Sequence, residues 1–231
     1  MNRYFLCAAS TLSFVLLSAC SLLIPPGIPS GMANPSVRSS RIADYPEHFA
    51  YRIDDHRYIT IQGNDDCDGM IYYHDTRLGI RTAVATTGLT LGDGAFRGYY
   101  AINSDYIAIP AIKFSQTSGA LLYLYYSREG GKTFDRFLFG GYDPGLDIVI
   151  LNGKTLYVAR MSQDPKEGVY LAYQYDISHE LITEQGQQLV IGDTWIEPPL
   201  VPLSVRSSSG ITRWVCGPSV DSTPNHEATQ K

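Results

Sequence analysis

The residues best suited to chemistry lie in one short stretch, GNDDCDGMIYYHD, over residues 63–75. Oxygen-bearing side chains and a glycine stand at the positions of a calcium-binding loop, namely Asn64, Asp66, Asp68, Gly69 and Asp75. Such a loop needs oxygen ligands at alternate positions, a glycine at the sixth position and a carboxylate at the twelfth. The pattern therefore allows a calcium site, although Asp75 is shorter than the usual glutamate and no helical pattern flanks the loop.

The same stretch has a second interpretation, which we favour. The tyrosines that follow Gly69 are typical of a strand, so the acidic residues before it would form the turn of a hairpin. A disulfide at Cys67 would hold that turn in one conformation. A rigid acidic loop that exposes Asp65, Asp66 and Asp68 predicts a surface for a protein partner rather than a metal site.

A second group of titratable residues, Asp54, Asp55 and His56, lies just upstream between two arginines. A histidine beside carboxylates can act in acid–base catalysis. Alternating charges that enter a strand are, however, more typical of a salt-bridged turn. We therefore predict that these three residues form a turn that contacts a partner, and we assign them no catalytic role.

The remaining patterns disfavour an enzyme. The five histidines show no paired metal-ligand spacing, and no serine stands in a Gly-x-Ser-x-Gly motif. A glycosidase would need a placed pair of carboxylates, which spacing alone does not define. The formal net charge of −5 makes the protein a poor ligand for nucleic acid. The sequence thus predicts a binding protein without a cofactor.

The N-terminus predicts the compartment. Asn2 and Arg3 give a short positive start, and an apolar run follows over residues 4–17. This pattern is typical of a secretory signal peptide, because the run is too short to span a membrane. Its end, Leu-Ser-Ala-Cys, resembles a bacterial lipobox, which implies cleavage before Cys20 and lipidation of that residue. The alternative is an ordinary signal peptide with a chance cysteine.

The lipobox resemblance also implies a membrane and a domain organisation. Ser21 and Leu22 follow the lipidated position, without the aspartate that retains lipoproteins at the inner membrane, so an outer-membrane anchor facing the periplasm is expected. Residues 20–44, which are rich in proline, glycine and serine, predict a flexible tether. Residues 1–19 would then be the signal peptide, and residues 45–231 a single folded domain.

The predicted compartment decides how the cysteines are interpreted. Cys7 would be lost with the signal peptide and Cys20 would carry lipid, which leaves Cys67 and Cys216. Because the periplasm is oxidising, a disulfide between these two is the simplest prediction. Closing a loop of about 150 residues would contribute about 4–5 kcal/mol in the chain-entropy treatment. Two buried free thiols are the alternative.

Strand-like segments make up most of the predicted domain. Short apolar or alternating runs rich in Tyr, Val, Ile, Thr and Phe are separated by turn residues. The expected strands lie near residues 57–63, 69–75, 79–85, 106–114, 120–127, 134–142, 147–160 and 168–176. Asn152-Gly153 predicts a tight hairpin, whereas residues 178–191 fit either one short helix or a strand pair. The prediction is an antiparallel all-β domain.

One motif narrows the fold. Residues 127–134, SREGGKTF, resemble the Asp-box Ser-x-Asp-x-Gly-x-Thr-Trp of β-propeller hairpins, with Glu129 for the aspartate and Phe134 for the tryptophan. In such a hairpin the serine and the acidic side chain fold back onto backbone amides, and the glycines permit the turn. The motif has a structural role and supports a propeller-like arrangement, with a β-sandwich as the alternative.

Residues 51–80, YRIDDHRYITIQGNDDCDGMIYYHDTRLGI, are similar to the Tli group of immunity lipoproteins, which accompany phospholipase effectors of bacterial type VI secretion. The Arg-Ile-Asp-Asp-His-Arg-Tyr segment, the cysteine-bearing turn and the Tyr-Tyr-His-Asp-Thr strand carry the resemblance. It implies a non-enzymatic protein that binds a cognate phospholipase and covers its active site. We expect Asp65, Asp66 and Asp68 to steer a basic rim of that partner.

Three further possibilities remain open at this stage. Met32 lies between the lipobox and the domain, so translation from it would give a cytoplasmic form that meets the phospholipase before export. The Asp-box resemblance would also suit an envelope glycan-binding or sialidase-like lipoprotein. A structural envelope lipoprotein without a toxin partner is the third possibility.

Overall fold

The computed structural model describes residues 44–63, 67–87, 96, 98–141, 147–162, 164, 166–181 and 194–215. The predicted signal peptide, Cys20 and the tether up to residue 43 lie outside these ranges, as do Asn64, Asp65, Asp66 and Cys216. The described residues form β-strands and one short 3-10 helix, η2 (Pro198–Leu200), which confirms the all-β prediction. No helix in these ranges has the length and apolar character needed to cross a bilayer.

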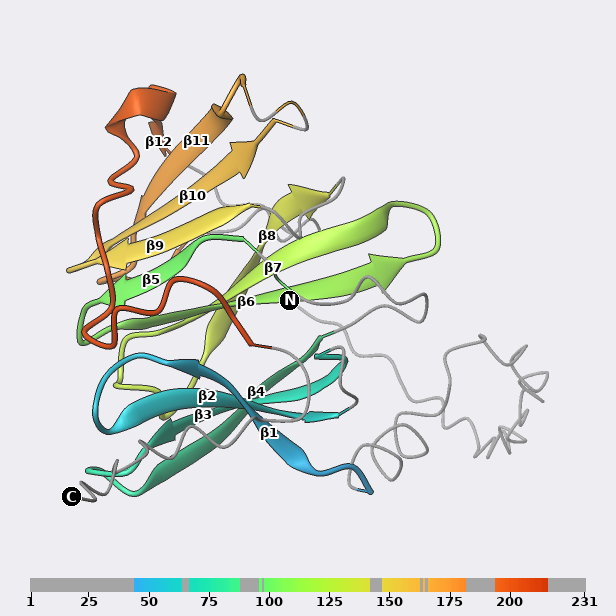
Figure 1. Cartoon of the computed structure of the whole chain (residues 1–231), viewed down its shortest axis with the longest axis vertical. Helices are drawn as coiled ribbons and strands as arrows, with labels where there is room; N and C mark the ends of the chain where they lie inside the picture. Colours follow the sequence, from blue (N-terminus) through green and yellow to red (C-terminus); the bar gives the residue numbers. More distant parts are fainter. Residues whose placement is uncertain are drawn as a thin grey trace, which may run out of the picture.

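The strands form three sheets (Figure 1). The first is a meander of β1 (Glu47–Arg52), β2 (Arg57–Gly63), β3 (Gly69–Asp75) and β4 (Ile80–Thr87). The second contains β6 (Ile107–Ser115), β7 (Gly119–Ser127) and β8 (Asp135–Gly141). The third has the order β12 (Thr194–Trp195), β11 (Val169–Asp176), β10 (Thr155–Met161), β9 (Ile148–Asn152) and β5 (Tyr100–Asn103).

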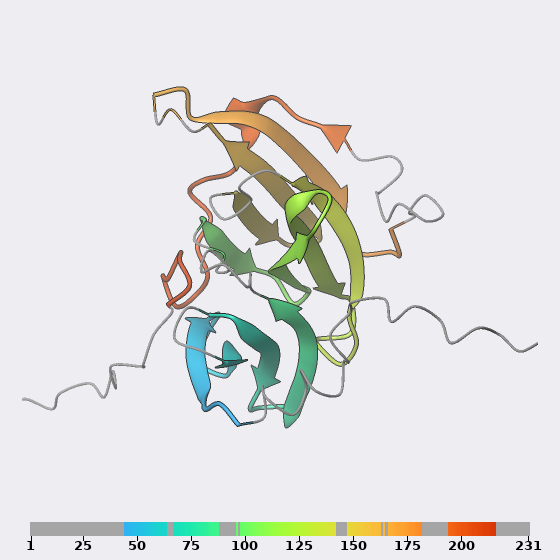
Figure 2. The same cartoon turned by 90° about the vertical axis from the view of Figure 1, so that its right-hand side faces the viewer.

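The pairing confirms an antiparallel fold with one exception. Each described neighbour pair is antiparallel apart from β5 and β9, which run parallel. None of the three sheets closes into a barrel. Figure 2 shows the first sheet at the opposite end of the molecule from β10, β11 and β12. Open sheets around a shared core are consistent with the sandwich-like alternative, and the propeller stays a prediction that the described strands do not show.

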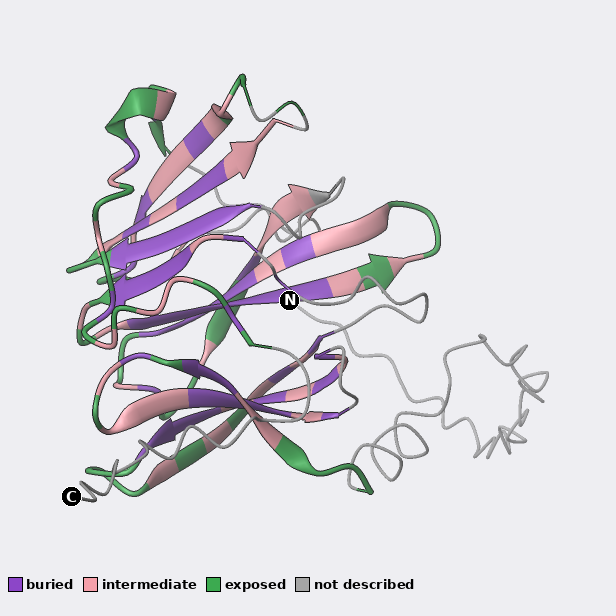
Figure 3. Cartoon of the chain, viewed as in Figure 1, coloured by how far each residue is buried: buried purple, intermediate pink, exposed green. Residues whose placement is uncertain are grey.

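A shared core joins the three sheets. It is lined by large apolar side chains from each of them, including Ile59, Ile71, Tyr73, Ile112, Leu124, Phe137, Val149, Leu156 and Val158. Figure 3 shows that β5 and β9 are buried along most of their length. The outward face of the third sheet carries a smaller cluster, in which Ile196 and Val201 pack against Ile148 and Ile150. The third sheet is therefore packed on both of its faces.

Two local predictions can be compared with the structure. Asn152 is paired with Thr155, so the β9–β10 hairpin turns at Gly153 and Lys154, one residue later than expected. Gly153 has a φ of 56°, which explains why glycine suits this position. In the segment 178–191, the residues up to 181 are not helical and the rest lies outside the described residues.

A C-terminal strap, residues 206–215, ties the first sheet to the third. Its Val215 N–H donates to the Ala50 carbonyl at 2.8 Å on the edge of β1, and the Tyr100 N–H donates to the strap's Thr212 carbonyl at 2.9 Å. The buried Tyr51 hydroxyl lies 2.6 Å from the Ser207 hydroxyl of the strap. Burial raises the pKa of Tyr51 to about 12, so this contact is between neutral groups. The strap thus protects a sheet edge that would otherwise be open.

Cys67 lies next to the end of the strap and is disulfide-bonded. Its Sγ lies 3.5 Å from the carbonyl oxygen of Val215, the residue that precedes Cys216 in the sequence. Cys216 itself lies outside the described residues, so its pairing with Cys67 stays a prediction. Cys67 has a φ of 59°, a left-handed conformation that is unusual for a residue other than glycine.

The Asp-box-like turn between β7 and β8 is built around Ser127. The Ser127 hydroxyl accepts hydrogen bonds from the N–H of Gly131 at 2.8 Å and of Glu129 at 3.2 Å, as the motif predicts. The Glu129 carboxylate differs from the prediction, because it accepts from the Thr133 hydroxyl at 2.9 Å rather than from a backbone amide. The buried serine therefore shapes the turn, and the exposed glutamate adds one contact at its surface.

This turn also docks onto the first sheet. The Phe134 ring meets the Tyr73 ring edge-on, with the centroids 6.1 Å apart. The Thr82 hydroxyl of β4 donates to the Gly131 carbonyl at 2.6 Å. A packed aromatic pair and a hydrogen bond thus connect the second sheet to the first through this hairpin.

Candidate functional site

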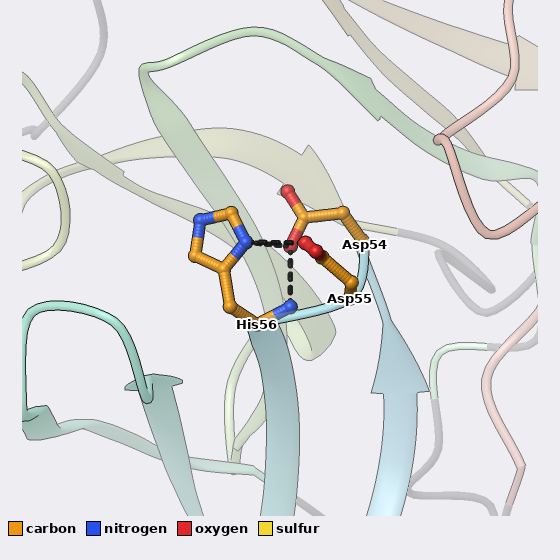
Figure 4. Close-up of side chains that lie close together, drawn as sticks. All are labelled: Asp54, Asp55 and His56. Atoms are coloured by element: carbon orange, nitrogen blue, oxygen red, sulfur yellow. Dashed lines mark hydrogen bonds and ion pairs between the residues drawn. The ribbon is translucent and has the colours of Figure 1, made fainter.

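The turn between β1 and β2 contains the predicted group Asp54, Asp55 and His56. Figure 4 shows the His56 ring and its backbone nitrogen both directed at the Asp54 carboxylate. That carboxylate accepts from the backbone N–H of His56 at 3.0 Å and of Arg57 at 2.7 Å, and from Arg57 Nε at 2.6 Å. Burial acts to raise the pKa of Asp54, but the hydrogen bonds from Arg57 outweigh it and the pKa is lowered. Asp54 therefore holds the turn in shape.

Asp55 and His56 are placed differently. The Asp55 side chain is 83% exposed, and its Oδ1 lies 2.5 Å from His56 Nδ1. The hydrogen bond with His56 is the main reason why the pKa of Asp55 is lowered. Arg77 Nη2, from the β3–β4 turn, lies 3.1 Å from the same imidazole nitrogen. Of the three predicted residues, Asp55 is the one with its carboxylate open to solvent for a partner.

The same three residues have potential metal-ligating atoms within 4.8 Å of one another. Asp54, however, already uses both carboxylate oxygens in hydrogen bonds with Arg57. A cation at this position would compete with the guanidinium for those oxygens, so the arrangement is that of the predicted salt-bridged turn. Exposed acidic groups commonly gather in this way without a metal.

The structure separates the residues of the proposed calcium loop. Asp75 is the last residue of β3, whereas Asp68 precedes its first residue, Gly69. A strand of this length spans about 20 Å, which is too far for one ion to be bound by both carboxylates. Asp75 is instead buried and accepts the backbone N–H groups of Arg77 at 2.9 Å and Leu78 at 3.0 Å. We therefore correct the sequence-based ligand set by removing Asp75, whose role is to cap the β3–β4 turn.

The two acidic groups predicted to bind a partner also lie apart. Asp54, Asp55 and His56 precede β2, while Asp68 belongs to the loop that follows it. Because β2 is an extended strand of seven residues, the two groups are about 20 Å apart and form no single cluster. Asp65 and Asp66, from the same loop as Asp68, lie outside the described residues.

The outer face of the first sheet carries a set of residues that the sequence-based prediction missed. Direct cross-strand pairing aligns one residue from each strand in a row: Arg52, Tyr58, His74 and Arg81. The neighbouring row contains Phe49, Thr60, Tyr72 and Ala83. The Tyr58 and His74 rings are stacked at 4.5 Å with an interplanar angle of 4°. The Arg81 guanidinium lies 3.7 Å from the centre of the Tyr72 ring.

Glu47, the first residue of β1, connects these rows through its side chain. Its Oε1 lies 2.8 Å from His74 Nε2, and its Oε2 accepts from Arg81 Nη2 at 2.8 Å. The Thr60 hydroxyl donates to the same carboxylate. Burial acts to raise the pKa of Glu47, but the hydrogen bonds from Thr60 and Arg81 outweigh it and the pKa is lowered. The outer face is thus a connected layer of rings and charges with fixed positions.

The imidazole at the centre of this layer predicts a pH effect on stability. Burial is the main reason why the pKa of His74 is lowered from 6.5, although Glu47 opposes the shift. Because the unfolded chain then binds a proton more readily than the folded one, the free energy of unfolding should fall as the pH drops below about 6.5. Replacing His74→Gln should flatten that dependence, measured by urea unfolding between pH 7.5 and 5.5.

The control for this effect is His179→Gln, because His179 is 67% exposed. That variant should keep the pH slope of the unchanged protein. An equal slope in the His74→Gln variant and the unchanged protein would show that His74 does not titrate on unfolding.

One family comparison bears on the identity of this protein. No curated protein and no solved structure matches the chain significantly. The family model described as "T6SS Tli3 immunity protein" matches residues 43–160, which is just over half of the chain. The matched region contains the whole first and second sheets, the Asp54–His56 turn and every residue of the outer face. The resemblance seen over residues 51–80 is confirmed, and the chain belongs to the T6SS Tli3 immunity protein family.

Proposed function

We propose that this protein neutralises a cognate phospholipase effector of type VI secretion by binding it and covering its substrate entrance. The observation that carries the proposal is the family match, because an immunity protein acts on a matching effector. The choice of a phospholipase rests on the similarity of residues 51–80 to immunity lipoproteins that accompany such enzymes. The protein would act by contact and would need no catalytic residue of its own.

The fold is suited to inhibition by contact. A surface that is already in its binding conformation loses little conformational entropy on association, which favours tight binding. The first sheet has such a surface, because its inner side belongs to the shared core and its β1 edge is bonded to the C-terminal strap. A tight complex would be expected to bury an interface of standard size or larger, about 1,600 Å² in total.

We further propose that the protein works on the periplasmic side of the outer membrane, anchored through lipid on Cys20. The lipobox-like residues support the anchor, and the disulfide-bonded Cys67 agrees with an oxidising compartment.

A minor cytoplasmic form starting at Met32 would meet the effector before export. Replacing Met32→Leu should then remove a shorter band on an immunoblot of the cell extract while the lipidated form persists.

Co-purification tests the function directly. The full-length protein, extracted in detergent, should retain a phospholipase effector encoded beside its own gene and should reduce that enzyme's activity in proportion to the complex formed. A phospholipase from an unrelated bacterium is the control and should be neither retained nor inhibited. Failure to retain or inhibit the neighbouring phospholipase would refute the proposal.

Charge reversal at Asp55 tests the turn that was predicted from the sequence. Asp55→Lys should weaken association with the effector by about two- to fivefold, the effect typical of a charge at the rim of an interface. Glu197→Lys makes the same charge change at an exposed residue outside the family match and should leave the affinity unchanged. Equal affinities for the two variants would exclude the turn from the interface. The same reversal at Asp65, Asp66 and Asp68 tests the other acidic loop.

A further inference from the structure

We infer that the effector docks on the outer face of the first sheet, and that this face takes a protein surface with an apolar centre bordered by carboxylates. The inference rests on the proposed function and adds to it the binding surface and the chemistry of the partner. It differs from the sequence-based expectation, in which acidic loops met a basic rim.

The ring composition of the outer face is that of a binding hot spot. Phe49, Tyr58 and Tyr72 are half-buried, and the Phe49 and Tyr58 rings lie 6.2 Å apart. Tyrosine and arginine are enriched among the residues that contribute most to protein–protein binding. The stacking of Tyr58 on His74 and of Arg81 on Tyr72 restricts these side chains before binding. Less side-chain entropy is therefore lost when a partner covers them.

The charge presented by this face is positive, although the whole chain carries a formal net charge of −5. The Glu47 carboxylate is occupied by His74, Arg81 and Thr60 within the layer. Arg52 lies at the far end of the row, over the Phe49 ring at 5.2 Å, and forms no ion pair with the described residues.

Arg81, at the other end of the row, is 50% exposed and uses one nitrogen on Glu47. A guanidinium has five N–H donors in a planar fork that matches a carboxylate. Arg52 and Arg81 can thus each receive a carboxylate from a partner that covers the rings between them.

The position of the face within the family match favours it over the exposed apolar groups of the C-terminal part. The outer face lies entirely within residues 43–160, the part of the chain that the family model matches. Several exposed large apolar side chains lie beyond that part, namely Tyr170, Trp195, Leu200 and Leu203. An immunity role common to the family is best explained by a surface in the part of the chain that the family model matches. We therefore place the docking surface on the first sheet rather than on β11, β12 and η2.

The test compares two charge reversals on exposed arginines. Arg52→Glu lies on the outer face, and Arg136→Glu makes the same change on β8 of the second sheet. Binding to the catalytically inactivated neighbouring phospholipase is measured by calorimetry, after thermal unfolding has confirmed that both variants are folded. Arg52→Glu should weaken binding about tenfold or more, and Arg136→Glu should change it less than about twofold. Arg52→Gln, which removes the charge and keeps a similar stem, should show an intermediate loss.

The possible outcomes separate the two proposals. If the unchanged protein binds and both arginine variants bind equally well, the docking surface is wrong while the proposed function stands. If only Arg136→Glu loses affinity, docking occurs on the second sheet and the inference is overturned. If gel filtration shows that the unchanged protein dimerises and Arg52→Glu does not, the face binds a second copy instead. If the unchanged protein does not bind the phospholipase, both proposals fall together.

Discussion

Reduction of the Cys67 disulfide is expected to lower the free energy of unfolding by about 2–5 kcal/mol, the usual effect of removing a native disulfide from a small secreted domain. The structural reason is that Cys67 adjoins the end of the C-terminal strap, where its Sγ lies 3.5 Å from the Val215 carbonyl oxygen. If Cys67 is paired with Cys216, as predicted, the disulfide adds a covalent link to the contacts that hold the strap to β1, such as the hydrogen bond from Val215 to Ala50. Urea unfolding with and without reductant measures the effect.

Two substitutions of Cys67 act as controls for this result. Cys67→Ala should match the reduced protein and should not respond to reductant. Cys67→Gly should lose the disulfide as well but should be about 1 kcal/mol more stable than Cys67→Ala, because glycine adopts the φ of 59° without strain. If reductant leaves the unchanged protein as stable as before, the disulfide does not secure the strap.

This result would bear on the proposed form that starts at Met32. The cytoplasm keeps thiols reduced, so that form would lack the Cys67 disulfide and its contribution to stability. We expect it to be degraded faster than the proposed exported form unless the effector is bound, because a partner that binds only the folded state stabilises it.

The second large effect is expected at Gly131 in the Asp-box-like turn. Gly131→Ala should destabilise the protein by about 2–5 kcal/mol, the sum of a left-handed conformation and overpacking in a core. Gly131 has a φ of 88°, and a Cβ added there would lie 2.0 Å from the buried Tyr73 ring. That ring cannot move away easily, because it is fully buried in the core between the first and second sheets.

The neighbouring glycine supplies a matched control. Gly130 has a φ of 63°, and a Cβ added there would meet nothing within 4 Å, so Gly130→Ala should cost only about 1 kcal/mol. Thermal and urea unfolding of both variants measure the difference. Combining Gly131→Ala with Tyr73→Ala should give less than the sum of the two single losses, because the overlap is gone. Equal losses for the two glycine variants would mean that the turn does not pack on Tyr73.

The stability of the Gly131→Ala variant also bears on whether the Asp-box-like turn has a structural or a functional role. The turn resembles a motif of sialidase-like proteins, but its serine, glycine and aromatic residues are engaged in turn formation and in docking onto the first sheet. A large stability effect at Gly131 would support this structural role. The hairpin would then help to hold β3 and β4, the strands that present His74, Tyr72 and Arg81 on the outer face.

The local structure of this protein is largely determined by its sequence. The expected strands 57–63 and 69–75 coincide with β2 and β3, and the Ser127 turn forms as its motif predicts. The strands depend on the alternation of apolar and polar side chains, and the turn depends on the conformations that serine and glycine adopt. Both are determined by a few neighbouring residues. The family resemblance also depends on a contiguous segment, so it could be recognised before the fold was known.

Only the tertiary structure decided which residues lie together. The strand register aligns Arg52, Tyr58, His74 and Arg81 across four strands, and strand length separates Asp68 from Asp75. The parallel pairing of β5 with β9 and the bonding of the strap to β1 join segments that are far apart in the sequence. Such contacts depend on how whole sheets pack around a shared core, and that packing is a property of the complete chain rather than of any short stretch of it.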